Sequence, residues 1–233
     1  MAQAVTIEVE LPSGSARLSG DWVQGGRDDT IVIAHGAGAG KNHPFLVGFA
    51  DALNEEGFST LRFNFAYVEQ GRRMPGPAAH AIAAWSAVIG SARARVPSAR
   101  VWAAGKSYGG RMASMAVSQG LLVDGLIYLG YPLHAPGKPE KPRAEHLPAI
   151  RVPQLFLEGT NDPFIQPLSQ FDEVVATCRD ARVEWVDGGG HSFEVKGRTR
   201  AASDVGADLA PVVAEFVDAA GRRTDESTEE EKA

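Results

Sequence analysis

The segment GKSYG (105–109) fits two chemistries, and the residues before it decide between them. Gly-Lys-Ser matches the end of the phosphate-binding loop G-x-x-x-x-G-K-[ST], while G-x-S-x-G is typical of a tight turn that presents a nucleophilic serine. The phosphate loop requires a glycine at position 100, but Arg100 stands there, and the residues 101–104 belong to an apolar strand. A strand that ends at Gly105 and a helix that begins after Ser107 instead predict a nucleophile that attacks a carbonyl group. The alternative is a serine that only caps the helix.

A serine nucleophile needs a base, and the base needs an acid to orient it. In this kind of fold the acid and then the histidine follow the serine along the chain. His191 lies in VDGGGHSFE (186–194), and it is the only one of the six histidines that follows the last expected strand. Asp162 lies in LEGTNDPF (157–164), just after the strand before that one. The alternatives are a surface histidine, and an aspartate that caps a helix together with the proline after it.

The glycine-rich segment HGAGAGK (35–41) is interpreted as part of an oxyanion site. A dinucleotide fingerprint would need glycine at position 41, where lysine stands, and the next expected strand ends in FNFAY without the acid that binds a ribose. We therefore expect no cofactor and no metal. An acyl-transfer intermediate needs N–H donors for its oxyanion, and the backbone N–H groups of Ala37 and Tyr108 are the candidates. Ordinary turn residues are the alternative for this segment.

The elements that must position these residues alternate along the chain. Strands are expected over 5–11, 16–23, 30–36, 59–67, 99–105, 125–131, 153–159 and 182–188, the first two as a hairpin. Helices are expected over 44–56, 78–94, 109–120, 167–178 and 203–219. This alternation predicts an α/β fold with a mostly parallel central sheet and helices on both faces.

Composition and charge narrow the class of protein. The chain has 233 residues, of which 44% are hydrophobic and 22% charged, which is ordinary for a globular protein. Its net charge of −6 lies mostly in the C-terminal residues, so we expect one domain over 1–222 and an acidic disordered tail over 223–233. We expect no nucleic-acid or membrane partner. A single cysteine and the lack of a secretory signal predict a cytoplasmic protein. The oligomeric state stays open.

Taken together, these motifs resemble the α/β-hydrolase superfamily. The resemblance is strongest to the dienelactone-hydrolase-like group, and within it to a small family that includes bacterial hydrolases and the α/β-hydrolase-like subunit of the NSL chromatin complex. The segments that carry it are AHGAGAG, LRFNFAYVEQGRR, GKSYGGRMAS, YPLHAPGKPEKPR, GTNDPF and GGGHSF. The resemblance implies a triad of Ser107, Asp162 and His191. Dienelactone hydrolases proper carry cysteine in the turn where this chain has serine, so dienelactone itself is not the expected substrate.

Three functions remain open on this sequence. The first is a serine hydrolase that cleaves a small carboxylic ester, lactone or thioester through an acyl-enzyme. The second is a non-catalytic scaffold or interaction module, and the third is a peptidase or acyltransferase on the same triad. The segment 132–150 is too short for a helical lid, so we expect a small acyl substrate and no large lid domain. A basic rim for an anionic substrate is a further hypothesis, with Arg72, Arg73, Arg111, His134 and Lys138 as its candidates.

Overall fold

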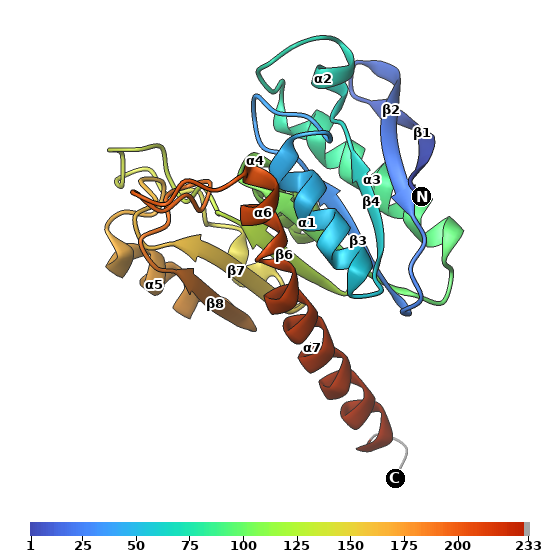
Figure 1. Ribbon diagram of the computed structural model, residues 1–233. Helices are drawn as coiled ribbons and strands as arrows, with labels where there is room; N and C mark the ends of the chain where they lie inside the picture. Colours follow the sequence, from blue (N-terminus) through green and yellow to red (C-terminus); the bar gives the residue numbers. More distant parts are fainter. Residues whose placement is uncertain (231–233) are drawn as a thin grey trace.

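An eight-stranded sheet forms the centre of the protein in this computed structural model (Figure 1). The strands are β1 (Gln3–Leu11), β2 (Gly14–Val23), β3 (Asp29–Ala34), β4 (Ser59–Phe63), β5 (Arg100–Lys106), β6 (Gly125–Leu129), β7 (Gln154–Gly159) and β8 (Ala181–Val186). Their order across the sheet is β1-β2-β4-β3-β5-β6-β7-β8. The hairpin β1–β2 and the pair β2–β4 are antiparallel, and the other five pairs are parallel. The predicted α/β fold and the predicted hairpin are confirmed.

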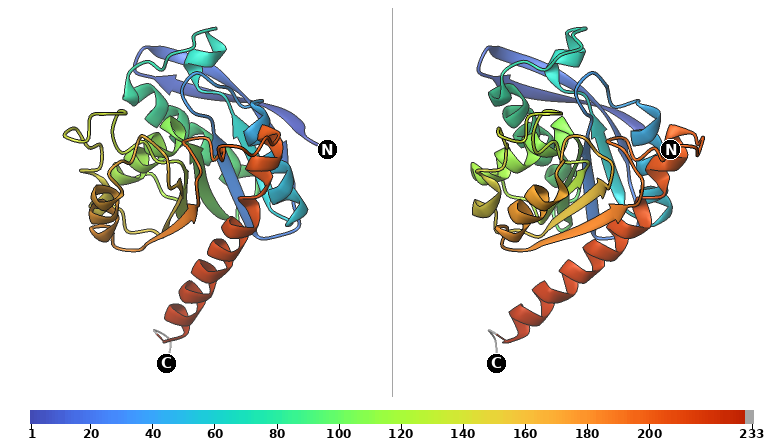
Figure 2. Two further views of the ribbon diagram at one scale, coloured as in Figure 1. Left: turned by 60° about the vertical axis from the view of Figure 1, so that its left-hand side comes forward. Right: turned by 90° about the vertical axis from the view of Figure 1, so that its left-hand side faces the viewer.

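Helices cover both faces of the sheet (Figure 2). The helices are α1 (Pro44–Glu55), α2 (Ala66–Glu69), α3 (Ala78–Arg95), α4 (Tyr108–Ser118), α5 (Leu168–Ala176), α6 (Ala202–Ala207) and α7 (Ala210–Glu230), with a short 3-10 turn at Leu147–Ala149. One core contains buried side chains of α3, α4 and α5, including Trp85, Met112 and Phe171. The other contains buried side chains of α1 and α7, including Phe49 and Val213. The central strands between these two cores are buried on both faces, as their apolar sequences predict.

The largest differences from the predicted elements lie in two places. The strand expected over 59–67 ends at Phe63, and the chain then turns so that Phe65 and Tyr67 pack against the ring of His35. The single helix expected over 203–219 is two helices, α6 and α7, because Pro211 lacks an N–H and its ring would collide with the carbonyl of a preceding helical turn.

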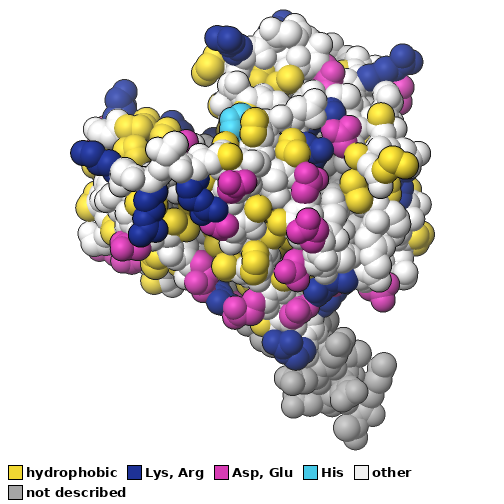
Figure 3. Space-filling view, in the orientation of Figure 1, with side chains coloured by type: hydrophobic (Ala, Val, Ile, Leu, Met, Phe, Trp, Pro, Cys, Tyr) yellow, Lys and Arg dark blue, Asp and Glu magenta, His cyan; other side chains and the backbone are white. Residues whose placement is uncertain are grey.

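The structure describes the backbone of residues 1–230 and the side chains of residues 1–222. The expected tail over 223–233 therefore lies outside the residues described with side chains, and its disorder stays a prediction. Within the described part of the chain, no helix is both long enough and apolar enough to cross a membrane. On the face in Figure 3, acidic and basic side chains are interspersed rather than gathered in one broad basic surface.

The topology brings the predicted site residues to one edge of the sheet. The parallel strands β3, β5, β7 and β8 all end at this edge, and ligand sites of open α/β sheets lie there. Ser107 directly follows β5, Asp162 follows β7 by three residues, and His191 follows β8 by five. The segment that contains Ala37 follows β3.

Candidate active site

Ser107 lies in a strained turn between β5 and α4. Its backbone has φ of 49° and ψ of −113°, a conformation that side-chain-bearing residues rarely adopt and that often marks a functional site. The turn is so tight that a Cβ on Gly105 would lie 2.2 Å from the backbone nitrogen of Gly110. A Cβ on Gly109 would lie 2.7 Å from the carbonyl oxygen of His35. The glycines on either side of Ser107 are therefore needed for strand and helix to meet.

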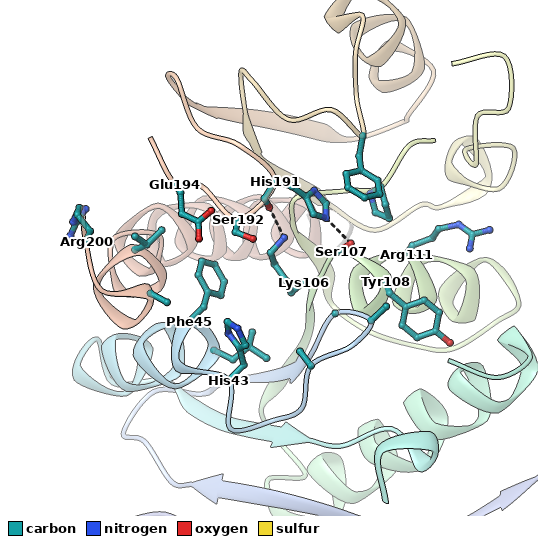
Figure 4. Close-up of a pocket in the computed structure, with 18 of the residues that line it drawn as sticks. His43, Phe45, Lys106, Ser107, Tyr108, Arg111, His191, Ser192, Glu194 and Arg200 are labelled. Atoms are coloured by element: carbon teal, nitrogen blue, oxygen red, sulfur yellow. Dashed lines mark hydrogen bonds between the residues drawn. The ribbon is translucent and has the colours of Figure 1, made fainter. Parts of the chain in front are cut away.

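Ser107, His191 and Asp162 form one hydrogen-bonded chain, although 84 residues separate Ser107 from His191. Figure 4 shows the bond between Ser107 and His191. The distance from His191 Nε2 to Ser107 Oγ is 2.8 Å. The distance from His191 Nδ1 to Asp162 Oδ2 is 2.6 Å. Since a carboxylate accepts hydrogen bonds, the Nδ1 atom donates to it, and Nε2 is then free to accept the hydroxyl proton of Ser107. The structure thus brings together the three side chains that the sequence singled out.

Asp162 is fully buried and uses both carboxylate oxygens. The Oδ1 atom accepts the backbone N–H of Phe164 at 2.8 Å, and the Oδ2 atom accepts His191. Helix α5 begins only at Leu168, so Asp162 does not cap it, which was the alternative interpretation. The ring of Phe164 stacks on the imidazole of His191, with 4.1 Å between ring centroids. Two side chains therefore hold the imidazole, one at its Nδ1 atom and one on its face.

The surroundings of His191 keep its imidazole neutral. Burial lowers the pKa of His191 below the ordinary value, and the positive charge of Lys106 lowers it further, while the hydrogen bond to Asp162 raises it. The net direction is downward. A neutral imidazole at physiological pH is the form that can accept a proton, which general-base chemistry requires.

The segment after β3 lies close to Ser107. A Cβ on Gly36 would be 3.6 Å from the Cβ of Ser107, so the next residue, Ala37, is within reach of a group bound at the serine. Tyr108 is the first residue of α4, and the first N–H groups of a helix have no acceptor within the helix. Both Ala37 and Tyr108 line the cavity over Ser107. These positions suit the two predicted oxyanion donors.

His35 holds that segment in place and is not a surface residue. It is fully buried. Its Nε2 atom accepts the backbone N–H of Phe65 at 3.1 Å, so the proton lies on Nδ1, which donates to the carbonyl of Gly36 at 2.8 Å. Burial lowers the pKa of His35, which favours this neutral form.

A cavity of about 470 Å³ opens over Ser107. Apolar side chains from α1, α6 and the segments near Ser107 line part of it, namely Phe45, Leu46, Pro132, Phe164, Ala202 and Val205. The charged side chains that line it are Lys106, Arg111, Arg143, Arg200 and Glu194. In Figure 4, Arg111 lies on one side of Ser107, while Phe45 and Arg200 lie on the other.

Of the five residues expected to form a basic rim, the structure brings only Arg111 to this cavity. His134 is fully buried and Lys138 is exposed elsewhere on the 132–150 segment. Arg143 and Phe164, which also line the cavity, are not among the site residues that the sequence predicts. No local pattern marks them, because each lies in an irregular segment whose path depends on tertiary contacts.

Lys106, the residue before Ser107, is turned inward. Its Nζ atom donates a hydrogen bond to the backbone carbonyl of His191 at 2.6 Å (Figure 4). The side chain thus lies along the cavity over Ser107 and contacts the loop after β8. Among the residues described with side chains, no three His, Cys, Asp or Glu side chains are grouped in a way that would hold a metal ion.

Comparisons with known proteins agree with this fold. The chain superimposes on a dienelactone hydrolase from Anabaena variabilis with a TM-score of 0.71 and 17% identity, over 92% of this chain and 96% of the other. An α/β serine hydrolase homologue from Coxiella burnetii gives 0.70 and 19%, over 91% and 96% of the two chains. A serine hydrolase without a lid from Xanthomonas campestris gives 0.68 and 19%, over 93% and 94%. At these identities the likeness concerns the fold.

The match to a protein family is more specific than these structural likenesses. The family described as alpha/beta hydrolase domain matches residues 27–218, which include β3 to β8 and all the residues of the site. The chain therefore belongs to the α/β-hydrolase family.

Proposed function

We propose that this protein is a serine hydrolase that cleaves a small carboxylic ester, lactone or thioester through an acyl-enzyme. Ser107 is the nucleophile, His191 is the general base and acid, and Asp162 orients His191. The observation that carries the proposal is the hydrogen-bonded chain through these three side chains, with 2.8 Å and 2.6 Å between its donor and acceptor atoms. The strained backbone at Ser107 and the lowered pKa of His191 support it independently.

In the first half of the reaction, Ser107 Oγ attacks the carbonyl carbon of the substrate while His191 Nε2 takes the hydroxyl proton. The carbonyl oxygen becomes an oxyanion that accepts hydrogen bonds from the N–H groups of Ala37 and Tyr108. Removing one such donor typically lowers the rate by about 10²–10³-fold. The tetrahedral intermediate collapses when the bond to the alcohol or thiol breaks, and the leaving group takes the proton from His191. Ser107 then carries the acyl group.

In the second half, water attacks the acyl-enzyme. His191 Nε2 takes one proton from this water, and the oxygen bonds to the acyl carbon. Collapse of the second intermediate releases a carboxylic acid and returns the proton to Ser107 Oγ. Throughout both halves Asp162 accepts the Nδ1–H of His191 and stabilises the imidazolium while it carries the proton.

The cavity favours a short substrate with a negative charge. Its volume of about 470 Å³ suits a small molecule, and its apolar side near Phe45 suits a short hydrocarbon arm. Arg200 pairs with Asp208, but neither Arg111 nor Arg143 forms an ion pair within the part of the chain described with side chains. The Nε atom of Arg111 is buried and has no hydrogen-bond partner there either. Guanidinium groups of this kind are suited to a substrate carboxylate.

Covalent labelling tests the proposal directly. The protein is treated with a fluorophosphonate, which reacts with activated serines, and intact mass is measured beside the variant Ser107→Ala. We expect a single adduct on the parent protein and none on the variant. A panel of short esters, lactones and thioesters then identifies the leaving group, and added alcohols, amines and peptides test for acyltransferase or peptidase activity.

The same experiment separates the proposal from a scaffold role. If the folded parent protein takes up no label and turns over no ester, His191 does not activate Ser107, and the proposal is wrong. A non-catalytic interaction module would then be the better explanation of the fold.

A further inference from the structure

Lys106 occupies the position between glycine and serine in G-x-S-x-G. The tight turn does not require a particular residue there. Here a lysine occupies it, and its partly buried side chain lines the cavity over Ser107. The Nζ atom reaches the backbone carbonyl of His191, 85 residues later, at 2.6 Å (Figure 4). A single hydrogen bond thus connects the residue before the nucleophile to the residue that carries the base.

The fold leaves room for this contact at Gly130, just after β6. A Cβ on Gly130 would lie 3.0 Å from the His191 carbonyl oxygen and 3.1 Å from Lys106 Nζ. The φ angle of Gly130 is +74°, which other residues rarely adopt. Three segments therefore meet at this bond: the end of β5, the end of β6 and the loop after β8.

Backbone hydrogen bonds, such as that from the Phe193 N–H to the Gly190 carbonyl, hold the loop that carries His191, and the Lys106 bond adds to them. Three consecutive glycines, 188–190, precede the histidine, and glycine restricts the backbone least of all residues. On the other side, Phe193 has φ of 65° and stacks on Phe45, with 5.8 Å between ring centroids. The Lys106 Nζ atom lies 5.6 Å from the ring centroid of Phe193 as well. Lys106 thus contacts the loop at both His191 and Phe193.

Lys106 lies among charged groups that affect its pKa, and its own charge affects the pKa of His191. Burial lowers the pKa of Lys106 to about 8, while the carboxyl groups of Asp162, Glu158 and Glu194 act in the opposite direction when they are ionised. The amine is therefore mostly protonated at neutral pH. Glu158 is fully buried, and burial raises its pKa well above the ordinary range, which favours its uncharged form. The charged groups that act on His191 are then Asp162, which raises its pKa, and Lys106, which lowers it.

We propose that Lys106 is a positioning residue for His191. Its bond to the His191 carbonyl fixes the imidazole between Ser107 and Asp162, and its positive charge disfavours protonation of that imidazole. The proposal rests on the proposed function, in which His191 is the base.

The test compares Lys106→Met with Lys138→Met, which removes the same charge from an exposed position. The kcat and KM of both variants are measured on a neutral activated ester across pH. Without the Lys106 charge the pKa of His191 rises, so the acidic limb of kcat/KM moves to higher pH. Loss of the bond loosens the loop, and we expect kcat to fall by about 10–100-fold with little change in KM. Lys138→Met is expected to match the parent protein in both respects.

A second variant separates the bond from the charge. In Gly130→Ala the new Cβ crowds the Lys106 amine at 3.1 Å, the His191 carbonyl oxygen at 3.0 Å and the His191 Nδ1 atom at 3.4 Å, so it disturbs the bond while the positive charge stays in the site. We expect kcat to fall while the acidic limb shifts less than in Lys106→Met. A change of folding stability alone would lower the active fraction of either variant and would leave the pH profile of the remaining activity where it was.

Nuclear magnetic resonance titration of ¹⁵N-labelled histidine makes the test independent of turnover. The His191 signal is assigned by its loss in His191→Gln, and its pKa is compared between the parent protein and Lys106→Met. A higher pKa in Lys106→Met together with a lower kcat supports the proposal. An unchanged His191 titration, or an unchanged kcat, overturns it. If the parent protein neither labels nor hydrolyses esters, the proposed function fails, and the titration alone still shows whether Lys106 acts on His191.

Discussion

Both carboxylate oxygens of Asp162 are engaged, so a change of one atom in this side chain has a defined consequence. In Asp162→Asn, the remaining oxygen accepts the Phe164 N–H, and the new NH₂ group faces His191 Nδ1. His191 must then accept at Nδ1 and carry its proton on Nε2, where it cannot take the proton of Ser107. We expect kcat on an activated ester to fall by about 10⁴-fold, while the melting temperature stays near that of the parent protein. A loss of less than about tenfold would contradict the orienting role of Asp162.

Substitution of Arg111 tests whether the protein prefers a substrate with a negative charge. Two esters with acyl chains of equal length are compared, 4-nitrophenyl pentanoate and the mono-4-nitrophenyl ester of glutaric acid, which carries a terminal carboxylate. We expect the parent protein to prefer the anionic ester and Arg111→Gln to lower kcat/KM for it by about 10–100-fold, the value of a hydrogen bond to a charged group. The neutral ester should change little.

The control for Arg111→Gln is Arg151→Gln, which removes the same charge from an exposed residue that does not line the cavity. It should leave both esters unaffected. Equal losses on both esters in Arg111→Gln would show that Arg111 supports the fold of the site rather than the binding of a carboxylate.

At the scale of elements, the junction of β5 and α4 tolerates no side chain at Gly105, because a Cβ there would overlap the backbone of Gly110. We expect Gly105→Ala to lower the free energy of unfolding by about 1–3 kcal/mol, as overpacking typically does, and to abolish labelling of Ser107. Gly90, an exposed residue inside α3, has no atom near its Cβ position. Gly90→Ala should instead raise the free energy of unfolding by about 0.5–1 kcal/mol. Urea unfolding measures both, and similar effects of the two substitutions would contradict the argument.

The sequence predicted the order of the elements because buried strands and helices have distinct apolar patterns. It failed where an apolar pattern continued past the end of an element, as at Phe65 and Tyr67, whose positions depend on packing against His35.

The residues of the site were predictable from the sequence only in part. Ser107, Asp162 and His191 could be found because each follows a predicted strand, and parallel strands end at one edge of the sheet. The inward direction of Lys106 and the place of Arg143 could not, since both depend on contacts between segments far apart in the sequence.

At the scale of the whole molecule, the two ends of the chain contribute differently to the core. The hairpin β1–β2 lies before the residues that match the family, yet it buries six large apolar side chains, Val5, Ile7, Val9, Leu11, Leu18 and Trp22, in the same core as α3 and α4. At the other end, the last buried apolar residue among those described with side chains is Ala220 in α7.

Two truncations should therefore have opposite outcomes. Removal of residues 1–26 exposes one side of β4 and the apolar face of α3, so we expect this variant to aggregate or to unfold without a cooperative transition. Removal of residues 223–233 spares all of the described core, so we expect the melting temperature to change by no more than about 2 °C, which for a domain of this size corresponds to less than about 1 kcal/mol. Thermal unfolding and fluorophosphonate labelling of both variants provide the comparison. A large loss of stability from the C-terminal truncation would show that the domain extends beyond residue 222, and an intact, labelled N-terminal truncation would show that the hairpin is an accessory to the fold.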